Sequence, residues 1–307
     1  MNNYRYTLEP YNGMKTRYHC PNCNKKGVFT KYIDLQGNEY LNDAVGYCNR
    51  LVKCGYHYKP KEYFNDNNIS LDTPISHKVT TSAKPKPKPK TSFVDVEVMQ
   101  KSKASKNPNY FIDYLTSLWD LDTALYLADK YNIGTSKLWQ GATVFWQVDK
   151  NNNVRSGKIM LYNASNGKRV KEPYNHINWV HSALKLDSFN LEQCYFGEHL
   201  LNEYKSKPVA IVESEKTAII SSVYLPEFIW LACGSANNLN EVKTRCLKGR
   251  NVVLFPDLKC YELWNDKIPQ LTSLATFRTS TLLNDKATET EKEQGLDLAD
   301  YLVKIKH

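Results

Sequence analysis

The stretch between Lys207 and Asp257 constrains the fold more than any other part of this chain. It contains three short apolar runs, each with the length and composition of a strand buried on both faces, and helix-length segments separate them. In chain order the predicted elements are strand 209–212, helix 215–224, strand 228–233, helix 239–247 and strand 251–255. This alternation predicts parallel strands joined by helical crossovers, and therefore an α/β fold.

Three residues follow the predicted strands directly: Glu213, Gly234 and Asp257. The carboxyl ends of parallel strands meet at one edge of a sheet, and ligands of such sheets bind beyond that edge. Carboxylate oxygens are ligands that magnesium prefers. Acids at strand ends can also cap the following helices, and this alternative stays open.

The order of a glutamate, a glycine turn and an aspartate after successive strands resembles the Toprim domain of primases, topoisomerases and certain nucleases. The resemblance implies that Glu213 is catalytic or a metal ligand, that Asp257 holds Mg²⁺ or Mn²⁺, that Gly234 lies near the nucleotide and that Lys216 contacts a phosphate. It covers residues 201–307, which we expect to form a parallel sheet with flanking helices.

One position departs from the Toprim pattern. Toprim domains usually carry Asp-x-Asp after the third strand, whereas this chain has Asp257-Leu258-Lys259. An ammonium group there repels magnesium, so we expect another acid to complete the site. The candidates are Glu262, which shares a helix face with Lys259 at spacing i, i+3, and the pair Asp297 and Asp300 in the tail. First-turn acids also stabilise a helix, so the tail pair has a structural alternative.

Near the N-terminus, four cysteines form the strongest motif of the chain: Cys20, Cys23, Cys48 and Cys54. Two cysteine pairs around a strand-rich insert predict a structural zinc site and a zinc β-ribbon over residues 1–64. The spacing of the second pair is loose, so His57 or His19 could replace one thiolate. The insert predicts a hairpin that turns at residues 36–38. The other four cysteines lack ligand spacing and are expected to be buried thiols.

Basic charge is concentrated in the first third of the chain. The net charge is +9, and residues 1–107 carry 18 Lys and Arg against nine Asp and Glu, whereas the remainder carries 23 of each. Aromatic residues are interleaved with these cations in the ribbon, which is typical of proteins that bind single strands. Residues 65–107 include the run Lys-Pro-Lys-Pro-Lys-Pro-Lys at 84–90. This composition predicts a flexible linker with no packed core, in which the alternating prolines make the chain extended and semi-rigid. A solubilising tail would explain the charge alone equally well.

Residues 108–200 predict a small α+β meander subdomain. Two helices are expected at 110–119 and 121–131, followed by strands at 142–148, 154–162 and 168–170. The region resembles the subdomain that precedes Toprim in bacterial-type primases, which presents basic residues toward template and nucleotide. The resemblance transfers this role to Arg155, Lys158, Lys168 and Arg169, although a solvated hairpin face would look the same. Residues 275–294 predict a surface loop.

Zinc ribbon, linker, meander and Toprim-like sheet is the domain order of bacterial-type primases, including the mobile-element and phage types of the Bacteroidetes. The resemblance implies a primase-like protein of DNA replication or mobile-element transfer, with single-stranded DNA, nucleotides and a replicative helicase as partners. A non-catalytic DNA-binding factor with a degenerate Toprim site, or a Toprim nuclease, are the alternatives. No run of 18 apolar residues or signal peptide is apparent, so we expect a cytoplasmic protein without membrane contact.

Overall fold

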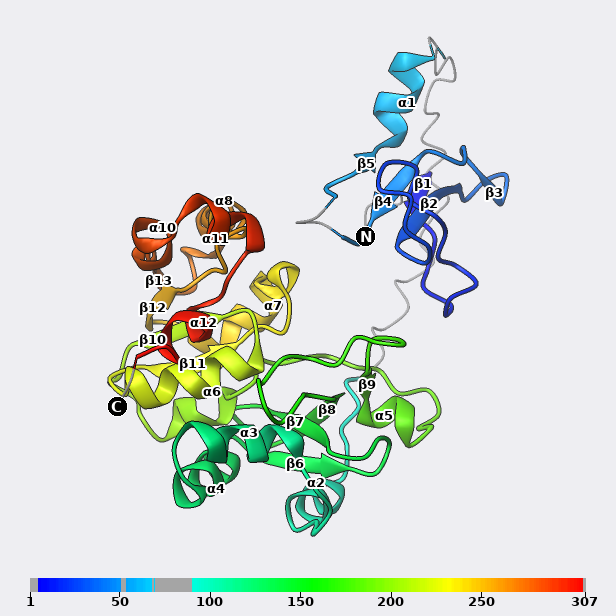
Figure 1. Ribbon diagram of the computed structural model, residues 1–307. Coiled ribbons are helices and arrows are strands. Elements are labelled where there is room, and N and C mark those ends of the chain that lie inside the picture. The colour runs from blue at the N-terminus through cyan, green and yellow to red at the C-terminus, as the bar shows by residue number, and fades with distance from the viewer. Residues whose placement is uncertain (1–4, 51–53, 68, 70–89, 306–307) are drawn as a thin grey trace. The chain divides into compact units, whose positions relative to one another are not determined.

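The chain consists of two compact units, residues 1–86 and 87–307. A computed structural model describes residues 5–50, 54–67, 69 and 90–305 (Figure 1). The predicted α/β fold class is confirmed, because the first unit contains an antiparallel sheet and the second contains one antiparallel and one parallel sheet. Residues 84–89 of the predicted Lys/Pro linker lie outside the described residues. Within the described part, no helix is long and apolar enough to cross a membrane.

The first unit is a β-ribbon. Its strands are β1 (Tyr6–Leu8), β2 (Phe29–Asp34), β3 (Glu39–Tyr40), β4 (Gly46–Cys48) and β5 (His57–Tyr58), followed by α1 (Pro60–Asp66). The order is β1-β2-β4-β5, with β3 paired to β2. The hairpin turns where the sequence predicts, since Asn38 has a φ of 53° and its N–H donates to Asp34 O at 2.8 Å. The buried cluster contains only Cys20, Phe29 and Cys48, so a metal site has to supply much of the stability.

The second unit begins with three helices, α2 (Val96–Lys103), α3 (Tyr110–Leu118) and α4 (Leu121–Lys130). Asn109 and Asp120 cap α3 and α4 by accepting from first-turn N–H groups, which explains why these helices begin where the sequence predicts. Helix α2 was not expected. The prediction of a linker without a packed core is wrong for this part, because Val94 and Met99 are buried against the sheet that follows.

The antiparallel sheet contains β6 (Ile133–Ser136), β7 (Ala142–Val148), β8 (Val154–Met160) and β9 (Ile177–Trp179), in that order, and α5 (Val180–Ala183) follows. The predicted meander is therefore present, but its last strand lies later than predicted. Residues 168–170 form only an isolated bridge between Arg169 and Tyr162. Residues 168–170 contain only one apolar side chain, whereas Val180, directly after β9, belongs to the hydrophobic cluster of the sheet.

The parallel sheet contains β10 (Val209–Val212), β11 (Ile229–Ala232), β12 (Asn251–Leu254) and β13 (Thr276–Thr279). The strand order is β11-β10-β12-β13, and all pairs are parallel, as the alternating pattern predicts for the first three. Helix α6 (Glu215–Tyr224) joins β10 to β11 and is capped by Ser214. Short helices complete the unit: η1 (Glu198–Asn202), η2 (Ala236–Asn238), α7 (Glu241–Thr244), η3 (Arg245–Leu247), α8 (Tyr261–Asn265), α9 (Ile268–Leu271), α10 (Leu282–Lys286), α11 (Glu289–Gln294) and α12 (Leu298–Leu302).

The prediction of a surface loop at 275–294 is wrong. This segment provides the edge strand β13 and helices α10 and α11, the latter begun by a capping box of Thr288 and Glu291. One hydrophobic core extends from Phe111 through Phe145 and Trp230 to Leu302. The segments predicted as 108–200 and 201–307 therefore share a core, which fixes residues of the antiparallel sheet against the carboxyl edge of the parallel one.

Candidate functional sites

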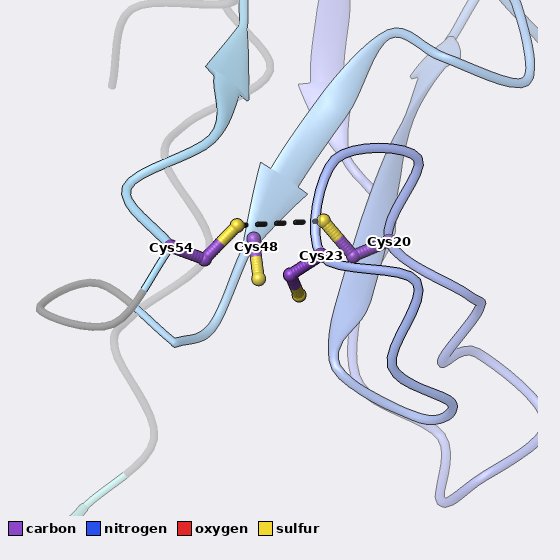
Figure 2. A group of neighbouring side chains, drawn as sticks. All are labelled: Cys20, Cys23, Cys48 and Cys54. Carbon is purple, nitrogen blue, oxygen red and sulfur yellow. Dashed lines mark hydrogen bonds between the residues drawn. The ribbon is translucent and has the colours of Figure 1, made fainter.

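The four cysteines of the first unit form a compact cluster (Figure 2). Their sulfur atoms all lie within 4.8 Å of one another, and Cys20 Sγ and Cys54 Sγ are 3.7 Å apart. Four sulfurs at about 2.3 Å from a zinc ion are about 3.8 Å from one another, so this spacing fits a tetrahedral zinc site. The predicted four-cysteine site is the one the fold assembles.

Local hydrogen bonds stabilise the thiolate form of two of these cysteines. The backbone N–H of Lys25 lowers the pKa of Cys23 to about 6, and that of Tyr56 lowers the pKa of Cys54. Burial raises the pKa of Cys48 to about 12, a cost that a bound cation would offset. The histidine alternatives are not used: His19 is exposed, and His57 Nε2 lies 2.9 Å from the Tyr32 hydroxyl.

The second site is the carboxyl edge of the parallel sheet, where Glu213, Gly234 and Asp257 follow β10, β11 and β12. The capping alternative does not apply to the two acids, since Ser214 caps α6 and Cys260 occupies the N-cap position of α8. Gly234 has a φ of 83°, which favours glycine, and its N–H donates to Glu213 O at 2.8 Å. The fold thus brings the three strand-end residues together, as predicted.

Asp257 and Glu213 are acids in an unfavourable environment. Burial raises the pKa of Asp257 well above its usual range, and the charges of Glu213, Asp297 and Asp300 raise it further, while Lys216 lowers it. Burial also raises the pKa of Glu213, and Lys158 partly offsets this. In the described part of the chain, the Asp257 carboxyl makes no hydrogen bond or ion pair. Carboxyls of this kind are characteristic of functional sites.

Lys158 reaches this edge from β8 of the antiparallel sheet. Its ammonium lies 3.1 Å from Glu215 Oε1 and donates to Gly234 O at 3.2 Å. Glu215 is 2% exposed at its side chain, and a β-carbon on Gly234 would lie 3.5 Å from its Oε1 atom. A charged pair is therefore buried beside the strand ends, and Lys158 also acts electrostatically on Glu213.

The tail acids Asp297 and Asp300 lie close enough to act on Asp257, but both have structural partners. They form a capping box at the start of α12, in which Asp297 accepts from Asp300 N at 3.0 Å and Asp300 from Asp297 N at 3.1 Å. Asp297 also accepts from the Thr217 hydroxyl at 2.8 Å, and Asp300 lies 3.8 Å from Lys216 Nζ. These contacts join α12 to α6, and the two helices lie side by side in Figure 1.

The remaining predicted acid, Glu262, is exposed on α8 and is not among the main charges acting on Asp257. Lys259 is exposed as well. Its aliphatic chain lies beside Gly295, and no ion pair joins it to Asp257 among the described residues. Among the described residues, the cysteine cluster is the only group of three or more His, Cys, Asp or Glu side chains placed to hold a metal ion, and the acids of the sheet edge do not form such a group.

The other predicted basic residues divide into two groups. Arg155 is held by Asp149, with Nε 2.7 Å from Oδ2, and its side chain is 19% exposed. Lys168 and Arg169 are exposed after β8, and Arg169 is near enough to lower the pKa of Glu213. Arg169 therefore lies beside the sheet edge, whereas Arg155 has a structural ion pair.

Sequence reasoning missed two residues at this edge. Glu215 is the buried partner of Lys158, and Cys260 donates to Glu213 Oε2 at 3.8 Å. The position of Glu215, directly after a strand-end acid and a helix cap, is the only signal that could have drawn attention to it. Nothing local identifies Cys260.

Two family models match parts of the chain. The model of a zinc beta-ribbon finger matches residues 4–69, which together with the cysteine cluster confirms the predicted zinc ribbon. A model described as "Domain of unknown function (DUF6371)" matches residues 109–258. A search of curated proteins gives no match.

Solved structures similar to the chain include three primases. The primase fragment of the bacteriophage T7 primase-helicase protein is 12% identical, with a TM-score of 0.38 over 91% of this chain and 98% of that one. The DnaG catalytic core is 14% identical, with a TM-score of 0.38 over 67% and 79%. The zinc-binding and RNA polymerase domains of the Aquifex aeolicus primase are 12% identical, with a TM-score of 0.35 over 97% and 80%.

Proposed function

We propose that this chain is a primase-like protein that binds single-stranded DNA through its zinc ribbon and transfers nucleotides at the carboxyl edge of its parallel sheet. The observation that carries the proposal is the meeting of two acids without cationic partners, Glu213 and Asp257, with the cations Lys158, Lys216 and Arg169. Acids of this kind suit a divalent cation, and the cations suit the phosphates that such an ion accompanies.

Under this proposal Glu213 and Asp257 hold Mg²⁺ or Mn²⁺, which would neutralise charge on the reacting phosphates. Lys216 and Arg169 contact phosphate oxygens, and Gly234 leaves room beside the buried Lys158–Glu215 pair. Because two carboxylates do not fill the coordination shell of a magnesium ion, substrate phosphates complete it. This also fits the position of Lys259, whose exposed side chain forms no ion pair with Asp257 and need not be displaced.

The ribbon has a surface that suits a single strand. A cavity of about 950 Å³ lies between β1, β2 and α1, with aromatic and basic side chains around it. Phe64 is buried and packs against Tyr6 in a tilted arrangement, with the ring centroids 5.2 Å apart. Bases can stack on the partly exposed rings of Tyr6 and Tyr32 while phosphates meet the cations. The cations are Arg5, Lys59 and Lys61.

The test uses the zinc-loaded full chain with a single-stranded template, labelled nucleotides, and magnesium or manganese. Incorporation of the labelled nucleotides into longer products supports the primase, and Asp257→Asn or Glu213→Gln should abolish this incorporation. Asp266→Asn is the matched control, since Asp266 is exposed and its side chain has no partner among the described residues. Shortening of the template would identify a nuclease instead.

A non-catalytic DNA-binding factor is the second candidate, and it is favoured because the edge acids do not form a group of three or more metal-binding side chains among the described residues. It predicts that the chain retains single-stranded DNA with no chemistry, and that Asp257→Asn leaves retention unchanged. Deletion of residues 1–86 should then reduce affinity and flatten its salt dependence, because fewer counterions are released. Unchanged affinity after this deletion would place DNA binding elsewhere.

A further inference from the structure

The 87–307 unit contains a cavity that lies away from the carboxyl edge of its parallel sheet. It has a volume of about 270 Å³ and is lined by α4, the carboxyl end of α6 and the first residues of β11. Strand β11 begins at Ile229 and reaches the proposed catalytic edge only after Ala232. Since the cavity is at the amino end of that strand, it is a separate site at the opposite edge of the sheet.

Aromatic rings form much of the cavity wall. Trp230 and Tyr131 are fully buried, whereas Tyr126 is 59% exposed and Tyr204 is 37% exposed. The rings that a ligand can reach are therefore those of Tyr126 and Tyr204, while Trp230 and Tyr131 lie behind them. Walls of this kind favour a planar, largely apolar group.

Two lysines, Lys130 and Lys207, contribute positive charge to the same cavity. Burial lowers the pKa of Lys130, the charge of Lys207 lowers it further, and Glu203 offsets only part of this. The ammonium of Lys130 lies 5.7 Å from the Tyr126 ring centroid, and that of Lys207 donates to Pro226 O at 2.9 Å. Neither lysine has an ion pair within the described ranges. Two like charges without a carboxylate partner suit an anionic ligand.

We propose that this cavity binds a mononucleotide. Its base would lie against the exposed rings of Tyr126 and Tyr204, and its phosphate would be bound by Lys130 and Lys207. The volume is at the lower end for ligand cavities and suits one nucleotide rather than a strand. The site is independent of the proposed function, because it requires neither Glu213 nor Asp257 and needs no divalent cation.

The probe is adenosine 5′-monophosphate, titrated by calorimetry into the zinc-loaded full chain without magnesium. We expect one site, with affinity reduced about tenfold or more in Lys130→Gln and in Lys207→Gln, since each removes a charged contact. Lys248→Gln is the control, because Lys248 is exposed and its side chain has no contact within the described part of the chain. Adenosine without phosphate should bind at least tenfold more weakly.

Tyr126→Ala separates binding from folding. Because this ring is 59% exposed, its removal should leave unfolding by urea nearly unchanged, while the affinity for the nucleotide falls severalfold. Asp257→Asn should retain full affinity, so failure of the catalytic proposal would leave this one standing. The proposal is overturned if adenosine binds as tightly as its phosphate, if Lys248→Gln loses as much affinity as the cavity variants, or if Asp257→Asn abolishes binding.

Discussion

Replacing Asp257 by asparagine should stabilise the 87–307 unit in the absence of magnesium. The carboxyl is held where burial and three neighbouring acids disfavour its charge, and only Lys216 among the main influences opposes them. Asparagine has nearly the same shape and carries no charge. The free energy of unfolding should rise by about 1–3 kcal/mol, the range for the cost of a buried polar group without a partner. For a unit of this size, each kcal/mol raises the melting temperature by about 2–4 °C.

The gain should depend on pH with a definite sign. The pKa of Asp257 is raised in the folded state, so the wild type is most stable below the unfolded pKa near 4, and it loses stability as the pH rises toward the folded pKa. Asparagine does not titrate. At about pH 4 this site should therefore contribute almost equally to the stability of the two proteins. Above that pH the stability of the variant should increase progressively relative to that of the wild type.

Tryptophan fluorescence is the suitable assay, because all six tryptophans lie between residues 119 and 264 and report only on this unit. Melting curves from pH 4 to 8 would be compared for wild type, Asp257→Asn and the exposed control Asp266→Asn. Magnesium should then raise the melting temperature of the wild type but not that of Asp257→Asn. A variant that is less stable than wild type at pH 7, or a difference independent of pH, would refute the reasoning.

Three further changes test other parts of the structure. Cys48→Ser should remove most of the zinc and unfold the ribbon, as metal analysis and loss of far-ultraviolet signal would reveal; a full equivalent of zinc would contradict the site. Lys158→Met should lower the free energy of unfolding in urea by about 3–5 kcal/mol, because it leaves Glu215 buried and unpaired. The double variant with Glu215→Gln should recover much of this stability, and equal losses in both variants would contradict the pairing. Lys259→Ala should change magnesium affinity less than about threefold in calorimetry, since no ion pair with Asp257 exists to be broken; a large gain would mean that the lysine blocks the ion.

The sequence by itself determined those features that depend on local pattern. The cysteine spacing identified the zinc ribbon, and apolar runs separated by helix-length segments identified three strands of the parallel sheet. Parallel strands end at a common edge, so the meeting of Glu213, Gly234 and Asp257 also followed from the sequence. Helices α3 and α4 were also predicted from the sequence, and the structure shows that Asn109 and Asp120 cap them.

Only the tertiary structure decided what lies around those residues. Lys158 and Glu215 are 57 positions apart, and no local pattern specifies a contact over that separation. Helix α2 and strand β13 have few apolar residues, so their signals are weak and the elements depend on burying Met99 and pairing with β12. The aliphatic chain of Lys259 likewise lies beside Gly295, which is distant in the sequence. Side-chain environments arise from packing between residues that are distant in the sequence, whereas the periodicity of strands and helices is a local property of the sequence.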